Sequence, residues 1–248
     1  MLREASNRDR AGNAAYLKGN SAGAVPILQA AAELHLAAGD LPGGAGTLLN
    51  LALAQRASGA VADASLTATR LRELTPAARQ QARERGDAAD QLAELEVAAR
   101  WLDALLAVSQ GDLPSAAGLL DAPALPLPAA SPWRGRLETL RAELALAEGR
   151  PAAALAYADR GAEASAAAGD RAEQARALRL AGLAHMQREE WEEARSDFMA
   201  AVRIEEALGA GARMVGDLDH LAIIATHLGD HSAARLYERR ARVIAAAR

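Results

Sequence analysis

One short segment has the residue types of a catalytic nucleophile. Gly19 to Gly23 read G-N-S-A-G, which matches the G-x-S-x-G pattern that presents a reactive serine in α/β-hydrolases. That chemistry needs a β-strand before the serine, a sheet around it, and an aspartate and a histidine downstream. A helical pattern precedes this segment instead, so we predict a turn between helices and no nucleophile.

Three histidines near the end of the sequence have side chains that can bind a metal ion. His220 and His227 are seven residues apart and can share one helix face, and His231 follows a turn. The alternative is that these histidines pack partly against neighbouring helices. The second interpretation is favoured, so no metal and no cofactor are predicted.

A glycine-rich stretch, Gly43 to Gly46, looks like part of a phosphate-binding loop. No strand precedes it and no Lys-Ser/Thr pair follows, both of which that chemistry requires. We predict a loop between repeats.

The composition favours helices and disfavours nucleic acid as a ligand. More than a quarter of the 248 residues are alanine, 51% are apolar and only 3% are aromatic. Alanine is the best helix former and a poor strand former. The net charge is −4, so there is no basic excess to bind phosphates, and there is no cysteine for a thiolate or a disulfide.

The sequence repeats one pattern at a nearly constant spacing. A turn pair such as Gly-Asp precedes an alanine by five residues, and Ala154, Ala194 and Ala234 are 40 residues apart. Glycine ends helices, and the apolar residues before each turn recur about every 3.6 residues, so each copy predicts a helical hairpin. The six copies begin at Gly19, Gly59, Gly111, Gly149, Glu189 and Gly229.

These repeats resemble the tetratricopeptide repeat (TPR), over essentially the whole chain. The copy that matches well is Leu178, Ala181, Gly182, His185, Trp191, Ala194, Phe198 and Ala201. The resemblance implies an all-α fold, a right-handed α-solenoid of stacked antiparallel helical hairpins that forms a TPR-like superhelix. The period of about 40 exceeds the usual ~34 residues, as in TPR-like modules of bacterial regulators.

The repeats divide the chain into two halves. Thr75-Pro76 is predicted to start an extra helix near 76–86, and four prolines exclude a helix from 121–133. That segment is predicted to be a linker between an N-terminal half (1–120) and a C-terminal half (134–248). The six hairpins are expected near 1–38, 42–75, 88–121, 133–168, 171–208 and 211–247.

In the resembled family, the first helices of the hairpins line a concave groove for a peptide or a partner helix. The arginines among these positions, beside apolar residues, favour a ligand with acidic and apolar side chains. The alternative is that the arginines form a solvated helix face. Carried over to this sequence, the groove positions are Trp101, Arg136, Arg176, Arg179, Leu183, Met186, Gln187, Asp219 and Ile223.

The predicted function is a non-catalytic scaffold that binds a protein or peptide. The alternative is a regulatory or sensory module that acts on another chain. No apolar stretch reaches the ~20 residues of a membrane span, and Met1 to Arg8 are too polar for a signal peptide. The expected location is the cytoplasm, or the periplasm or envelope if a leader was removed before residue 1. An unpaired first hairpin is compatible with a homo-oligomer.

Overall fold

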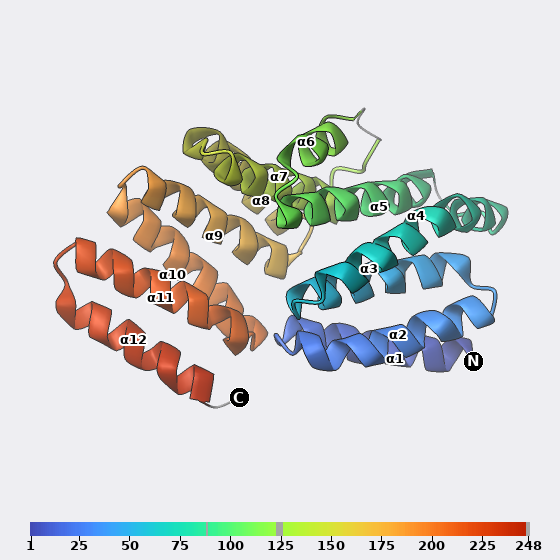
Figure 1. The fold of residues 1–248 in the computed structure, drawn as a ribbon, viewed down its shortest axis with the longest axis horizontal. Coiled ribbons are helices and arrows are strands. Elements are labelled where there is room, and N and C mark those ends of the chain that lie inside the picture. Colours follow the sequence, from blue (N-terminus) through green and yellow to red (C-terminus); the bar gives the residue numbers. More distant parts are fainter. Residues whose placement is uncertain (88, 123–125, 247–248) are drawn as a thin grey trace. The chain divides into compact units, whose positions relative to one another are not determined.

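A computed structural model describes residues 1–87, 89–122 and 126–246. Within these residues every regular element is an α-helix, and the helices follow one another as antiparallel pairs (Figure 1). The first three pairs are α1 (Leu2–Leu17) with α2 (Ser21–Ala37), α3 (Leu41–Ala57) with α4 (Val61–Glu84), and α5 (Ala89–Gln110) with α6 (Leu113–Asp121). The last three are α7 (Pro132–Ala147) with α8 (Pro151–Ala167), α9 (Arg171–Gln187) with α10 (Trp191–Leu208), and α11 (Gly211–His227) with α12 (His231–Ala246).

The chain forms two compact units, Met1–Pro128 and Ala129–Arg248. Within each unit, helices that are consecutive in the sequence pack against each other. The predicted fold class is therefore confirmed: this is an all-α solenoid of stacked antiparallel helical hairpins of the TPR-like kind. None of the described helices is both long and apolar enough to cross a membrane.

The turn within each hairpin needs one residue in the left-handed conformation. After α7, Gly149 has φ of +70°, and the N–H of Arg150 donates to the carbonyl of Ala145 at 2.8 Å. After α9 the same place is taken by Glu189, with φ of +61°, which is the one non-glycine with positive φ in the described residues. A side chain in this conformation is strained, so the hairpin must be held by its packing.

The predicted turn between helices is present at Gly19 and Asn20, and Ser21 to Gly23 form the first turn of α2. Asn20 is the N-cap of α2, and its side-chain oxygen accepts a hydrogen bond from the N–H of Gly23 at 3.0 Å. The serine of the G-x-S-x-G pattern is the first residue of that helix. The prediction for Gly43 to Gly46 was wrong, because these residues lie inside α3. A Cβ on Gly44 would come within 2.7 Å of Leu36, so glycine here permits close packing of two helices.

No separate helix begins at residue 76. Helix α4 runs without a break through Pro76, and the hydroxyl of Thr75 donates to the carbonyl of Leu71 at 2.8 Å instead of capping a new helix. Ala78 and Ala82 beyond the proline are buried. Their burial continues the apolar face of α4, which offsets the one helical hydrogen bond that the proline removes.

The linker predicted at 121–133 is shorter than expected, because helices include residues at both of its ends. Helix α6 ends at Asp121, and α7 already includes Pro132 and Trp133, with Ser131 as its N-cap. Proline is tolerated in the first turn because its missing N–H would have no partner within the helix. Residues 123–125, which belong to the proline-rich stretch, lie outside the described residues.

Candidate functional site

The predicted groove residues of the C-terminal half lie on the first helices of three consecutive hairpins, α7, α9 and α11. Turn geometry fixes where these helices start. The carboxylate of Asp170, the N-cap of α9, accepts a hydrogen bond from the N–H of Glu173 at 3.2 Å. The same carboxylate also contacts the preceding hairpin.

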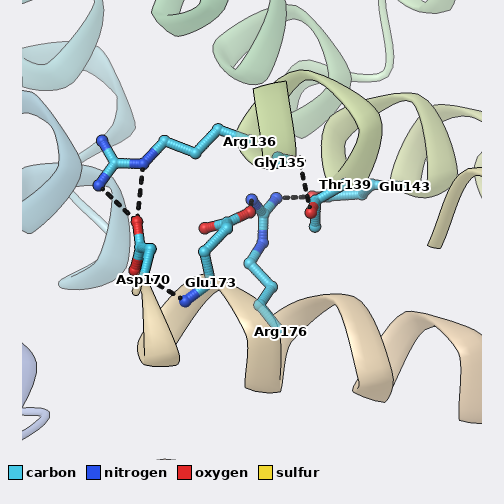
Figure 2. A network of polar contacts seen from close by, with 7 residues as sticks. All are labelled: Gly135, Arg136, Thr139, Glu143, Asp170, Glu173 and Arg176. Atoms are coloured by element: carbon cyan, nitrogen blue, oxygen red, sulfur yellow. Dashed lines mark hydrogen bonds and ion pairs between the residues drawn. The ribbon is translucent and has the colours of Figure 1, made fainter. Parts of the chain in front are cut away.

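Arg136 on α7 is bound by the N-cap of the next first helix. Its Nε and Nη2 donate to Oδ2 of Asp170 at 3.2 and 3.0 Å (Figure 2). The guanidinium also lies 4.9 Å above the ring of Trp133, within cation–π range. This arginine therefore ties hairpin α7–α8 to hairpin α9–α10.

Arg176 on α9 pairs with one carboxylate from each of two first helices. It donates to Glu173 on its own helix at 3.0 Å and forms an ion pair with Glu143 on α7 (Figure 2). All three side chains are part-exposed. Together with Arg136 and Asp170 they form a strip of alternating charge on which both signs reach solvent.

Arg179, one turn further along α9, is bound in a buried cluster. Its Nη2 donates to Asp217 of α11 at 2.9 Å, and a second ion pair joins it to Glu205 of α10. Both carboxylates are almost fully buried, and Oε2 of Glu205 has no hydrogen-bond partner within the described residues. We call Arg179, Glu205 and Asp217 the buried charge cluster.

The pKa values in this cluster follow from burial opposed by ion pairing. Burial raises the pKa of Glu205 to about 7, because the attraction of Arg179 only partly compensates and the charge of Asp217 adds to the shift. Burial alone would lower the pKa of Arg179, but its hydrogen bond to Asp217 and the charges of both carboxylates hold that pKa above its ordinary value. The guanidinium of Arg179 is thus bound by two carboxylates of the same chain.

Two predicted apolar groove residues are used mainly for packing. Leu183 and Met186 on α9 are part-buried against the core of the second unit, a cluster that includes Phe198 and Leu218. Gln187 is exposed at the end of α9. Of these three side chains, the amide of Gln187 is therefore the most accessible.

The two predicted residues of α11 reach solvent. Asp219 is exposed, and Ile223 is 48% exposed although its neighbours Leu221 and Ile224 are buried. Trp101 is different, since it lies on α5 in the other unit and is only 3% exposed. The prediction that Trp101 lines an accessible groove is therefore wrong.

Two of the three predicted histidines stack on aromatic rings, and the third, His231, is exposed at the start of α12. His227 stacks on Trp191 with ring centroids 3.9 Å apart, and His220 stacks on Phe198 at 4.9 Å. Nδ1 of His220 is also 2.7 Å from the carbonyl oxygen of Gly216. Among the described residues, no group of three or more His, Cys, Asp or Glu side chains could hold a metal ion.

Sequence reasoning missed the partner carboxylates. Glu205 falls in a second helix, 40 residues before Ala245 and 40 after Ser165, so a carboxylate stands where the two neighbouring copies have a small residue. That departure from the repeat pattern was the available signal for a buried ion pair. A charged residue at a buried repeat position needs a partner, and Arg179 is the nearest cation.

Comparison with known proteins supports the fold. No protein-family model matches the chain, and no curated protein matches it. The crystal structure of BtubC (BKLC) from P. vanneervenii is similar, with a TM-score of 0.58, 19% sequence identity and coverage of 94% of this chain and 91% of that chain. The TPR2AB domain of yeast Sti1, in its complex with pHSP90, gives a TM-score of 0.35 at 15% identity over 97% and 98% of the two chains, which is too loose to carry an argument. The likeness to BtubC, at 19% identity, supports the fold described above and nothing beyond the fold.

Proposed function

We propose that the chain is a non-catalytic interaction scaffold that binds a peptide or helix of a partner protein along its first helices. The proposed surface, which we call the first-helix row, consists of the accessible side chains of α7, α9 and α11. Its members are Arg136, Glu143, Arg176, Gln187, Asp219 and Ile223.

The observation that carries this proposal is the half-exposed Ile223. The apolar side chains around it on α11 are buried in the core, whereas Ile223 is left in water. Its position is 40 residues after Leu183, so it follows the same helix face as the predicted groove residue of the preceding repeat. Covering such a side chain with a partner stabilises a complex by about 1–2 kcal/mol.

The charges of the first-helix row favour a ligand of mixed charge over a strongly acidic one. Arg136 and Arg176 already contact carboxylates, so an acidic ligand must compete with Asp170, Glu173 and Glu143. Exposed ion pairs contribute little on their own, so the row fixes the orientation of a peptide more than its affinity. An apolar side chain of the ligand over Ile223 supplies the affinity.

The test is capture of partners from a lysate of cells that produce the chain, quantified by mass spectrometry. The Ile223→Arg variant is expected to lose the captured partner by at least about tenfold, since it places a charge where the ligand's apolar side chain docks. The matched control is Leu236→Arg, which changes an apolar residue that is 60% exposed on α12, outside the row.

Both variants alter only exposed side chains, so circular dichroism should show unchanged helix content. Partner capture that survives in the Leu236 variant and is lost in the Ile223 variant supports the proposal. Equal capture by both variants contradicts it.

A further inference from the structure

The first unit contains a hollow that the first-helix row does not include. A space of about 290 Å³, open to solvent, is lined by side chains of α4, α5 and α6. Helices α4 and α6 both pack on α5, and α6 has only nine residues. Each of the three helices therefore contributes side chains to the wall of the hollow.

The lining of the hollow combines apolar and polar side chains. Leu106 of α5 and Leu119 of α6 line it together with alanines. The side-chain amide of Gln110 donates to the hydroxyl of Ser65 at 2.9 Å, which links α5 to α4. A ligand that fits must combine an apolar stem with a polar or charged end.

One carboxylate, Asp103, faces this space together with one guanidinium, Arg72. Nη1 of Arg72 donates to Oδ2 of Asp103 at 2.9 Å. The aspartate side chain is 18% exposed and the arginine side chain 57% exposed. The carboxylate is thus fixed in the wall, whereas the arginine reaches it from solvent.

The carboxylate is incompletely compensated. Burial raises the pKa of Asp103, and the charge and hydrogen bond of Arg72 oppose that shift without cancelling it. A second cation that enters the hollow would stabilise the charged form. An entering cation competes for Asp103 with an arginine that is mostly exposed, whereas an entering carboxylate would have to draw Arg72 away from Asp103.

We propose that this hollow binds a basic side chain, arginine or lysine, from a peptide of a partner protein. The cationic head contacts Asp103 at the wall, and the methylene stem lies on Leu106 and Leu119. Ser65 and Gln110 can hydrogen-bond the peptide backbone beside the side chain. The site is independent of the first-helix row, because it is built in the other unit, from α4, α5 and α6.

The test uses the full chain labelled with ¹⁵N and the peptide acetyl-Ala-Leu-Arg-Leu-Ala-amide, followed by NMR titration to about 5 mM. We expect shifts in the amides of residues 65–72, 103–110 and 115–119. The peptide with citrulline in place of arginine keeps the shape but lacks the charge, and it should bind about tenfold more weakly. The peptide with glutamate should not bind.

Two variants have opposite expected effects. Asp103→Asn should weaken binding of the arginine peptide about tenfold, because it removes the carboxylate that contacts the cation. Arg72→Gln should strengthen binding a few-fold, because it removes the competing cation while Asp103 remains. An unfolding defect of either variant would be visible in the NMR spectrum without ligand.

Several outcomes would overturn the assignment. These are the absence of any shift up to the highest concentration, equal affinity for the arginine and citrulline peptides, and unchanged affinity in the Asp103 variant. If arginine amide alone bound as tightly as the arginine peptide, the ligand would be a small free cation and not a peptide.

Discussion

Three arginines on the first helices α7 and α9 form ion pairs with carboxylates that differ in how far they are buried. Arg136 and Arg176 contact carboxylates that water also reaches, whereas Arg179 contacts Glu205 and Asp217 in the core. A pair in water contributes at most about 1 kcal/mol, but removing one member of a buried cluster leaves an uncompensated charge. Identical side chains on one helix therefore have different surroundings: Arg176 stays accessible in the first-helix row, and Arg179 holds two hairpins together.

The first prediction compares these two arginines. Arg179→Gln should lower the free energy of unfolding by about 2–4 kcal/mol, because two buried carboxylates lose their cation. Arg176→Gln, three residues earlier on the same helix, should lower it by less than about 1 kcal/mol. Urea unfolding followed by circular dichroism measures both values, and equal losses would refute the distinction.

The second prediction concerns pH. The pKa of Glu205 is raised to about 7 in the folded chain, so the folded state takes up a proton more readily than the unfolded state between its ordinary value near 4.5 and about 7. This carboxyl therefore stabilises the fold at low pH and loses that contribution as pH rises through 7. Glu205→Gln, which stays neutral, should raise Tm by about 2–4 °C at pH 8 and by little at pH 5.

Thermal unfolding of both chains at pH 5, 6, 7 and 8 measures that difference. Asp197, whose pKa burial raises to about 6, is present in both chains and cancels. A Tm difference that does not change with pH would show that Glu205 does not titrate in this range.

At the scale of the helices, small residues set how closely neighbours approach. A Cβ on Gly182 of α9 would come within 2.8 Å of the ring of Phe198 on α10, in the core of the second unit. At Gly216 of α11 a Cβ would meet nothing within 4 Å. The two glycines thus separate the effect of packing from the effect of helix propensity.

The third prediction uses this contrast. Gly182→Ala should destabilise the chain by about 1–3 kcal/mol through overpacking against Phe198. Gly216→Ala should stabilise it by about 0.5–1 kcal/mol, because alanine is the better helix former. Stabilisation by both substitutions, measured by urea unfolding, would mean that α9 and α10 are not packed as closely as described.

The hairpins could be predicted because their signals are local. Glycine turns and 3.6-residue spacing placed five of the six pairs to within a few residues, whereas the second pair, predicted to end at residue 75, ends at Glu84. The helix boundaries predicted at Pro76 and Pro132 were wrong. Whether a proline ends a helix depends on the burial of the residues around it and on whether it lies in the first turn. The partners of Arg179 come from α10 and α11, and such long-range pairs have no local signature.

Across the whole molecule, the same repeat positions change from core to surface. Phe198 and Val202 of α10 belong to the core shared with α11, whereas 40 residues later Glu238 and Arg242 of α12 are exposed. The polar side chains at these positions of α12 face solvent, whereas the equivalent apolar side chains of α10 pack against α11.

The measurement that tests this account most directly is photo-crosslinking of the full chain. A benzophenone amino acid is placed at Ile223 in one variant and at Leu236 in another, and crosslinked peptides from a lysate are identified by mass spectrometry. The account predicts one partner segment crosslinked from position 223 and absent from position 236. Crosslinks from position 236 alone, or the same segment from both, would contradict binding along the first helices.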